Sequence, residues 1–231
     1  MPSETQARRR ERAREVLARL EAHMPGAKIE LDFRSPLELL VAVILSAQCT
    51  DKRVNQVTPA LFERYPDAAA YASSTLGELE SFIASCGLFR SKAKNIQAAA
   101  RALLERHHGE VPIGRAELEA LPGVGRKTAG VVGNHLGGEA AFPVDTHVFR
   151  VSRRLGLARA KTPEKVEAEL SAILPISSWM KGHQLLVWHG RRVCHARGPA
   201  CSQCPVEALC PKKGLARPKP EASRAVRRVR P

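Results

Sequence analysis

Apolar side chains recur along most of the chain at intervals of three and four residues, with polar and charged residues between them. Ile96, Ala99 and Leu103 illustrate this spacing, which places all three on one face of a helix. We find no alternation of apolar and polar residues long enough to indicate a strand. The pattern predicts an all-α fold of about ten helices, separated by segments rich in glycine and proline.

Two helix starts can be read from their first residues. Thr162 and Pro163 open one helix, because threonine caps the first amides and proline suits the first turn. Asp51 is expected to cap a second helix that runs to Arg64. Proline cannot donate the backbone hydrogen bond of a helix interior, so Pro59 should kink this second helix or restart it.

The longest apolar run, from Leu39 to Leu45, is seven residues long. A membrane-spanning helix needs about 20 apolar residues, so this run predicts a buried helix, and we expect no membrane partner. The arginines at 8–10 are accompanied by the acidic Glu4 and Glu11, which argues against a transit peptide.

The net charge of the chain indicates that its partner is a polyanion. The net charge is +14 and the isoelectric point is near 10.1, values typical of proteins that bind nucleic acid. Residues 212–231 hold eight Lys or Arg and one Glu, so they contribute +7 and leave +7 on the remainder. We expect residues 214–231 to form a disordered basic tail that attracts phosphates; a purely solubilising tail is the alternative.

Four cysteines lie close together near the C-terminus, separated by gaps of six, two and five residues: Cys194, Cys201, Cys204 and Cys210. So short a segment cannot bury much apolar surface, and four thiolates would suit tetrahedral zinc or an iron–sulfur cluster. Zinc sites usually pair their ligands in two short knuckles, whereas here only one pair is so closely spaced. The spacing favours an iron–sulfur cluster, with zinc and two disulfides as the alternatives.

Residues 116–136 predict two short helices joined by a tight turn. The turn consists of Pro122, Gly123, Val124 and Gly125, and Arg126 begins the second helix. The glycines permit positive φ angles and leave backbone amides uncovered, so the turn can bind a phosphate at the start of a helix. This arrangement resembles the helix-hairpin-helix, a motif that binds the nucleic-acid backbone. A turn without a ligand is the alternative.

Two further residues carry candidate chemistry. Lys127 lies in the first turn of the second helix, where the helix dipole and Arg126 should lower its pKa. A neutral amine is a nucleophile that can form a Schiff base with a sugar carbon. Asp145 precedes a segment in which Val148, Val151 and Leu155 follow helical spacing, and it should cap that helix. Its carboxylate could also stabilise positive charge on a sugar as a base departs, or help to deprotonate the lysine.

Together these segments resemble the helix-hairpin-helix DNA glycosylases. The resemblance rests on the run from Leu121 to Ala129, on the run from Val144 to His147, and on the cysteine gaps. It covers residues from about 30 to about 213, with the three motifs in the family's order. The cysteine pattern makes the chain similar to the endonuclease III family.

The resemblance implies a bifunctional enzyme of base excision repair. Such an enzyme is a DNA glycosylase and AP lyase that removes oxidised pyrimidines from double-stranded DNA and nicks abasic sites by β-elimination. Lys127 matches the family's Schiff-base lysine and Asp145 its catalytic aspartate. The four cysteines match the ligands of a [4Fe–4S] cluster, which in this family shapes a DNA-binding loop. We expect a monomer that acts in the bacterial cytoplasm, associated with the nucleoid.

The resemblance also indicates DNA contacts. Gln48 and Leu88 match residues that fill the gap left by an everted nucleotide. From the residues alone, Leu88 would be a core leucine and Gln48 a polar residue at a helix end. The remaining expected contacts are in the hairpin and near the cysteines: Gly123, Val124, Gly125, Arg126, Arg191 and Arg197.

The implied architecture is two helical lobes flanking a DNA-binding cleft. A helical barrel domain spans residues 29–139 and contains the hairpin. A second domain joins residues 1–28 to residues 140–213 and holds the cluster. Within this family pattern Gly130 is a departure, because asparagine is common there. The missing side chain could widen the pocket or loosen the second helix by about 1 kcal/mol.

Three alternatives to the bifunctional enzyme remain. A monofunctional glycosylase shares the hairpin, the aspartate and the cluster but usually lacks a lysine at the position of Lys127. A non-catalytic DNA-binding protein would need no pairing of Lys127 with Asp145. A redox carrier would not require arginines around the cysteine loop. Cys49 and Cys86 lie outside the cysteine pattern and are interpreted as ordinary buried thiols.

Overall fold

The structure is a computed structural model of the chain and describes residues 4–215. Over this range it contains α-helices and short 3-10 helices (η) but no strand, which confirms the all-α prediction. The elements in chain order are α1 (Gln6–His23), α2 (Pro36–Ser46), α3 (Asp51–Arg64), α4 (Ala68–Ser73), α5 (Leu76–Ile83), α6 (Phe89–His107), α7 (Arg115–Glu119), α8 (Arg126–His135), α9 (Thr146–Arg154), α10 (Pro163–Ile173), η1 (Ile176–Ser178), α11 (Trp179–Arg192), η2 (Cys201–Gln203) and η3 (Glu207–Leu209).

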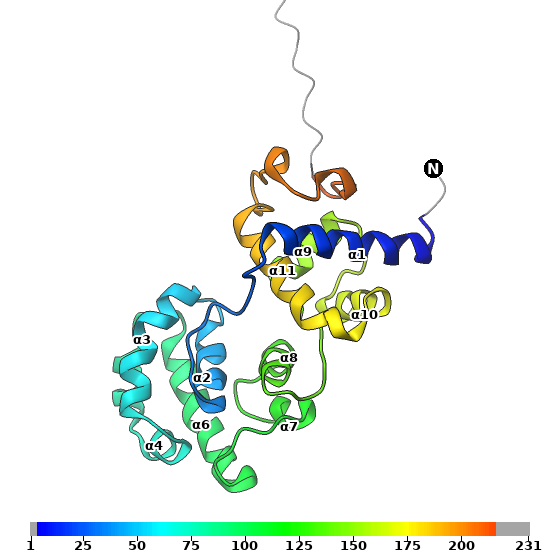
Figure 1. The fold of residues 1–231 in the computed structure, drawn as a ribbon. Coiled ribbons are helices and arrows are strands. Elements are labelled where there is room, and N and C mark those ends of the chain that lie inside the picture. Colours follow the sequence, from blue (N-terminus) through cyan, green and yellow to red (C-terminus); the bar gives the residue numbers. More distant parts are fainter. Residues whose placement is uncertain (1–3, 216–231) are drawn as a thin grey trace, which may run out of the picture.

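The helices form two groups, each with its own hydrophobic core. In Figure 1, α2 to α8 make up one group, while α1 lies beside α9, α10 and α11 in the other. The first core is built from buried residues between Leu31 and Val132. The second joins residues 13–27 to residues 142–206. We call these groups the first and second lobes, and we propose that the chain passes between them near residues 29 and 139.

The apolar run Leu39–Leu45 lies in α2, and each of its residues is buried. Helix α2 packs against α3, α6 and α8, so it forms the centre of the first lobe. Ser35 caps it by accepting a hydrogen bond from the amide of Glu38 at 3.2 Å. Within residues 4–215, no helix combines the length and apolarity that crossing a bilayer requires.

Helix α3 begins differently from the prediction. Thr50 is its cap and accepts a hydrogen bond from the amide of Arg53 at 3.2 Å. The predicted role of Asp51 was therefore wrong, because Asp51 is the first helical residue. Within the described residues its carboxylate accepts no hydrogen bond from a backbone amide, and it bonds instead to Arg191 of the second lobe. At α10 the prediction was right, since Thr162 is the cap and Pro163 stands in the first turn.

Pro59 neither ends nor restarts α3, which continues to Arg64. A proline inside a helix costs about 3 kcal/mol through the lost hydrogen bond and a steric clash. The face of α3 that carries Val54, Thr58 and Leu61 is buried in the first core. Tertiary packing of this face outweighs the local cost, as it does for most helices in proteins.

Candidate active site

A cavity of about 800 Å³ opens between the two lobes. The first lobe contributes Gln48, at the end of α2, and Lys127, in α8. The second lobe contributes Asp145 at the start of α9, and His183 and Arg191 from α11. The structure thus brings four residues predicted from separate segments, Gln48, Lys127, Asp145 and Arg191, to the wall of one cavity. Its size suits a ligand about as large as a nucleotide.

Lys127 is the second residue of α8. Burial lowers the pKa of its amine, and the cation of Arg191 acts in the same direction, whereas Asp145 and Asp51 oppose the shift. The predicted direction is confirmed, but the neighbouring cation is Arg191 of the second lobe. Arg126 does not contribute to this shift, because its guanidinium is paired with Glu167 on α10. Removal from water is the main cause, because it penalises the charged form of the amine.

Asp145 is the N-cap of α9, as the sequence predicted. One carboxylate oxygen, Oδ1, accepts a hydrogen bond from the amide of Val148 at 2.7 Å. The second oxygen has no hydrogen-bond partner within the described residues. The cap fixes the position of the carboxylate, and the second oxygen remains available to a ligand in the cavity.

His183 is a cavity residue that sequence reasoning missed. Its Nδ1 lies 2.8 Å from the carbonyl oxygen of Pro143, two residues before Asp145. This contact requires a proton on Nδ1, so Nε2 is an acceptor in the neutral ring. Burial lowers the pKa of His183 to about 4, opposed by Asp145 and reinforced by Lys127. The ring is therefore neutral near pH 7. Nothing in the spacing of the histidines indicated this contact.

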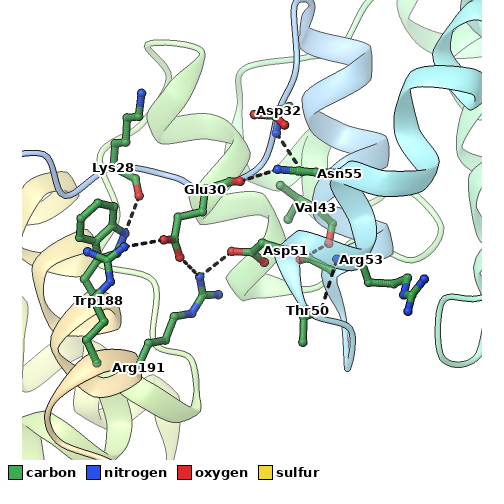
Figure 2. Close-up of polar contacts among 12 residues, drawn as sticks. Lys28, Glu30, Asp32, Val43, Thr50, Asp51, Arg53, Asn55, Trp188 and Arg191 are labelled. Carbon is green, nitrogen blue, oxygen red and sulfur yellow. Dashed lines mark hydrogen bonds and ion pairs between the residues drawn. The ribbon is translucent and has the colours of Figure 1, made fainter.

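Arg191 connects the two lobes at the edge of the cavity. Its Nη1 donates to the carboxylate of Asp51 at 2.6 Å and also to Glu30. Figure 2 shows the Arg191 guanidinium between these two carboxylates, with Asp51 on α3 and Glu30 on the segment between α1 and α2. Burial opposes the charge of Arg191, but the carboxylates more than offset that effect and raise its pKa.

The segment between α1 and α2 is itself tied to both lobes. The indole nitrogen of Trp188, in α11, donates to the carbonyl of Lys28 at 2.9 Å. The side chain of Asn55, in α3, donates to the carbonyl of Glu30 at 2.8 Å. These bonds, visible in Figure 2, hold the Glu30 carboxylate in place to receive Arg191.

Arg126 forms a second ion pair between the lobes. Its Nε donates at 2.7 Å to Glu167 on α10, and Arg115 on α7 donates to the same carboxylate at 3.1 Å. Glu167 is almost fully buried, so it needs these partners. The guanidinium groups of Arg126 and Arg191 are thus both engaged by carboxylates, which the sequence did not reveal.

The hairpin has free backbone amides where the sequence predicted them. Gly123 has a φ of +78°, and a Cβ added there would lie 2.7 Å from the Cβ of Asn95, so only glycine suits this position. Val124 is different, because its side chain is buried and its amide donates to the carbonyl of Leu121 at 3.1 Å. The amides of Gly123 and Gly125 have no hydrogen-bond partner among residues 4–215.

Gln48 and Leu88 are two of the few non-glycine residues with a positive φ, 52° and 59° respectively. Such a backbone is costly for residues with side chains. Leu88 is 58% exposed, so the expectation of a core leucine, which the residues alone would give, was wrong. A Cβ on Gly87 would lie 3.2 Å from the carbonyl oxygen of Gln48, which shows that the two turns lie against each other.

Gly130 lies in the buried part of α8 and does not line the cavity. A Cβ there would come within 3.2 Å of Ala141 and Pro143. The glycine therefore allows the segment that leads to Asp145 to pack closely on α8. The idea that its missing side chain widens the pocket was wrong, because this space is filled by the chain itself.

The four cysteines of the C-terminal motif surround one small pocket at the end of α11, away from the cavity. Arg154 Nη1 donates to the sulfur of Cys194 at 3.4 Å, and the amide of Lys212 donates to that of Cys210 at 3.4 Å. His189 Nε2 lies 3.6 Å from the sulfur of Cys204. Sulfur ligands of a metal centre accept such bonds.

Burial raises the pKa values of Cys204 and Cys210, so neither thiol ionises readily without a cation or a metal. Among the described residues, no three of His, Cys, Asp and Glu are arranged to hold a single metal ion. Four sulfurs around an apolar pocket suit a group larger than one ion. Beside this pocket Arg197 is exposed and forms no ion pair within residues 4–215.

Comparison with known proteins gives a consistent result. Residues 41–175 match the model of the HhH-GPD superfamily of base excision DNA repair proteins. An endonuclease III from Synechocystis sp. is 51% identical over 206 residues, covering 89% of this chain and 94% of the relative. An endonuclease III from Escherichia coli is 46% identical over 199 residues, covering 86% and 94%.

Solved structures agree. A trapped covalent intermediate of endonuclease III with DNA superposes with a TM-score of 0.85 at 46% identity, covering 88% of this chain and 96% of that one. A thermostable thymine-DNA glycosylase shares the fold, with a TM-score of 0.77 at 21% identity. With the cavity, the capped aspartate and the four-cysteine pocket in place, the chain belongs to the endonuclease III family of the HhH-GPD superfamily.

Proposed function

We propose that Lys127 and Asp145 carry out the reactions of the endonuclease III family in this chain: removal of an oxidised pyrimidine and cleavage of the resulting abasic site. One observation supports the assignment most. A lysine whose pKa is lowered by burial and a carboxylate fixed by a helix cap line the same cavity, from opposite lobes. The first supplies a neutral nucleophile and the second a fixed negative charge.

The reaction begins when the neutral Lys127 amine attacks C1′ of an everted nucleotide. The bond from C1′ to the base breaks, and its electron pair leaves with the base, which takes up a proton. The Asp145 carboxylate stabilises positive charge on the sugar while this bond breaks. A proton passes from the nitrogen to O4′ as the C1′–O4′ bond breaks, so the ring opens and leaves an iminium at C1′. Removal of a C2′ proton then expels the 3′ phosphate, and hydrolysis of the iminium restores the lysine.

DNA would lie across the mouth of the cavity. The amides of Gly123 and Gly125 can bind one backbone phosphate at the start of α8, where the helix dipole favours an anion. Gln48 and exposed Leu88 would enter the space left by the everted nucleotide. Arg197 is free to contact a phosphate. Chromosomal DNA as the partner also supports a place at the bacterial nucleoid.

Arg126 and Arg191 could bind a DNA phosphate only after their ion pairs with carboxylates are broken. Each guanidinium already has a carboxylate partner, and a phosphate would have to compete with Glu167 or with Asp51 and Glu30. We propose that both arginines mainly hold the lobes at the spacing that the cavity needs. Their charge would then act on DNA only at long range.

The four cysteines would hold a [4Fe–4S] cluster. When bound, this group supplies a cross-link that replaces a hydrophobic core in the loop from 194 to 210. Arg154 and the amide of Lys212 would hydrogen bond to ligand sulfurs, as they do in the structure. Arg154 also donates to the carbonyls of His195 and Ala196, at 2.6 and 2.8 Å, so it shapes the turn that presents Arg197.

Borohydride trapping tests the catalytic assignment. We expect the protein to form a covalent adduct with duplex DNA that contains thymine glycol or an abasic site. Lys127→Ala should abolish the adduct while retaining DNA binding. Lys165→Ala, which removes an exposed lysine on α10, is the matched control and should trap normally. An undiminished adduct with Lys127→Ala would place the nucleophile elsewhere, and base release without any nicking would favour a monofunctional glycosylase.

Metal analysis tests the cluster separately. The purified protein should be yellow-brown and contain about four iron and four sulfide per chain. Cys204→Ser should lose this absorbance and weaken DNA binding. A colourless protein with one zinc per chain would overturn the cluster but would leave the assignment of Lys127 intact.

A further inference from the structure

Lys92 is a buried lysine that the proposed chemistry does not use. It lies in α6 and is only 4% exposed. Its Nζ makes one hydrogen bond, to the carbonyl oxygen of Leu45 at 2.8 Å. Burial lowers the pKa of the amine, and the thiols of Cys49 and Cys86 oppose this shift. Burying the charged form of a lysine costs free energy, and the hydrogen bond to Leu45 offsets part of this cost.

The bond joins the two segments that lead to the proposed inserting residues. Leu45 is in the last turn of α2, three residues before Gln48. The backbone amide of Lys92 donates to the carbonyl of Leu88 at 3.0 Å, so its side chain extends from the first turn after Leu88. One lysine therefore contacts the end of the helix before Gln48 and the start of the helix after Leu88.

The electrostatics favour this contact. Carbonyl groups in the last turn of a helix have no partner within the helix, and they form the negative end of its dipole. The Lys92 amine satisfies one of them. The thiol of Cys86 offers no stronger partner, since burial raises its pKa to about 11 and keeps it neutral near pH 7. Cys86 is buried as expected, while Cys49 is half-buried.

We propose that Lys92 is a positioning residue that holds the turns of Gln48 and Leu88 together, so that both side chains enter DNA as one unit. The proposal rests on the insertion roles given above. It gives a reason for the contact between two turns that both have costly positive φ angles. Gly87 supports the same unit, because its lack of a Cβ lets it lie against the carbonyl of Gln48.

The test compares duplex DNA, where a nucleotide must be everted, with single-stranded DNA, where it need not. Duplexes carry an abasic site opposite 2-aminopurine, whose fluorescence rises when insertion unstacks it. Lys92→Met should lower trapping on the duplex and the fluorescence rise at least ten-fold, while trapping on a single strand stays within two-fold. Gly87→Ala should behave in the same way, because the new Cβ would displace the carbonyl of Gln48.

A control separates positioning from simple loss of stability. Leu103→Ala removes a buried side chain from the far end of α6 without touching either turn. Its trapping on duplex and on single-stranded DNA should stay within two-fold of the parent protein. Equal effects of Lys92→Met on the two substrates, or a duplex rate like that of Leu103→Ala, would overturn the proposal. If Lys92→Met does not fold, Lys92→Gln takes its place, because its shorter side chain cannot make the same contact with the carbonyl of Leu45; normal insertion by a folded Lys92→Gln protein contradicts the proposal.

Leu88→Ala separates this proposal from the proposed function. If Leu88→Ala leaves the duplex rate and the fluorescence unchanged, insertion by Leu88 is wrong, and the role of Lys92 fails with it. If Leu88→Ala loses both signals while Lys92→Met and Gly87→Ala keep them, insertion stands and only the role of Lys92 is wrong.

Discussion

Arg191 in α11 donates to the carboxylate of Asp51 in α3 at 2.6 Å, so a helix of one lobe is bonded directly to a helix of the other. The same Nη1 also donates to Glu30, on the segment that joins the lobes. Because Arg191 also helps to lower the pKa of Lys127, one guanidinium both holds the cavity together and favours its neutral amine. Stability and chemistry are therefore coupled at this residue.

Arg191→Met should reduce the free energy of unfolding by about 2 kcal/mol, because it leaves the mostly buried carboxylate of Asp51 without its partner and close to Glu30. Adding Asp51→Asn should restore part of the loss by removing one of these charges. Denaturant unfolding of the single and double variants measures both effects. Arg192→Met is the matched control. Arg192 is half exposed, donates to Glu30 and lies over the Trp188 ring. Methionine can keep part of the packing on that ring, so the substitution should cost about 1 kcal/mol, less than the loss of Arg191.

Asp145 has a structural role and a proposed chemical role, which different substitutions should separate. Asparagine is a good N-cap, so Asp145→Asn should lose base release while its unfolding free energy falls by less than about 0.5 kcal/mol. Asp145→Ala should lose activity and about 1 kcal/mol of stability. Thr75→Ala removes the cap of α5 far from the cavity, and it should lower stability alone. Normal turnover by a folded Asp145→Asn protein would contradict the chemical role.

The depressed pKa of His183 predicts a loss of stability in mild acid. The folded ring has a pKa of about 4 against 6.5 in the unfolded chain. Between these values the unfolded state binds a proton that the folded state does not, so stability falls as the pH falls. From pH 7.5 to 5.5 the contribution is about 1.4 kcal/mol. Over this window the titratable groups facing the ring are Asp145, Lys127 and His135.

The His183 contribution can be isolated by measuring unfolding at both pH values for the parent protein and for His183→Gln. Glutamine can still donate to the carbonyl of Pro143 but does not titrate. The parent should lose about 1.4 kcal/mol more than the variant. Identical pH dependence in the two proteins would show that folding does not lower the pKa of His183.

Gly130 and Gly77 should respond to alanine to different extents. Both are helical, and alanine is favoured over glycine in a helix by about 1 kcal/mol. Gly77, in α5, has nothing within 4 Å of its added Cβ, so Gly77→Ala should raise the unfolding free energy by up to that amount. At Gly130 the Cβ would press on Ala141 and Pro143, so Gly130→Ala should gain less, and Gly130→Asn should be destabilising.

A lowered melting temperature for Gly130→Asn should be accompanied by slower base release, since Pro143 leads directly to Asp145. Gly77→Ala should leave base release unchanged. If Gly130→Asn is as stable and active as the parent, the packing of this segment does not restrict the position of the aspartate.

The local features of the protein were predictable because each depends on residues that are close in sequence. The caps at Asp145 and Thr162, the buried helix from Leu39 to Leu45 and the free amides of the hairpin follow from side chains and backbone within one or two turns. The fold class followed from helical periodicity. Gln48 and Leu88 were identified as candidate DNA contacts only through the family resemblance, and no local pattern indicated their positive φ angles.

What the tertiary structure decided is which charged groups meet. Asp51 was expected to cap its own helix, yet it bonds to Arg191, 140 residues away, because Thr50 takes the cap. Arg126 was expected to face phosphate, yet Glu167 holds it. The positions of His183 and Lys92 depend on helices packed from distant segments. Coulomb and hydrogen-bond energies depend on separation in space, which sequence distance does not report, so these partnerships exist only in the folded chain.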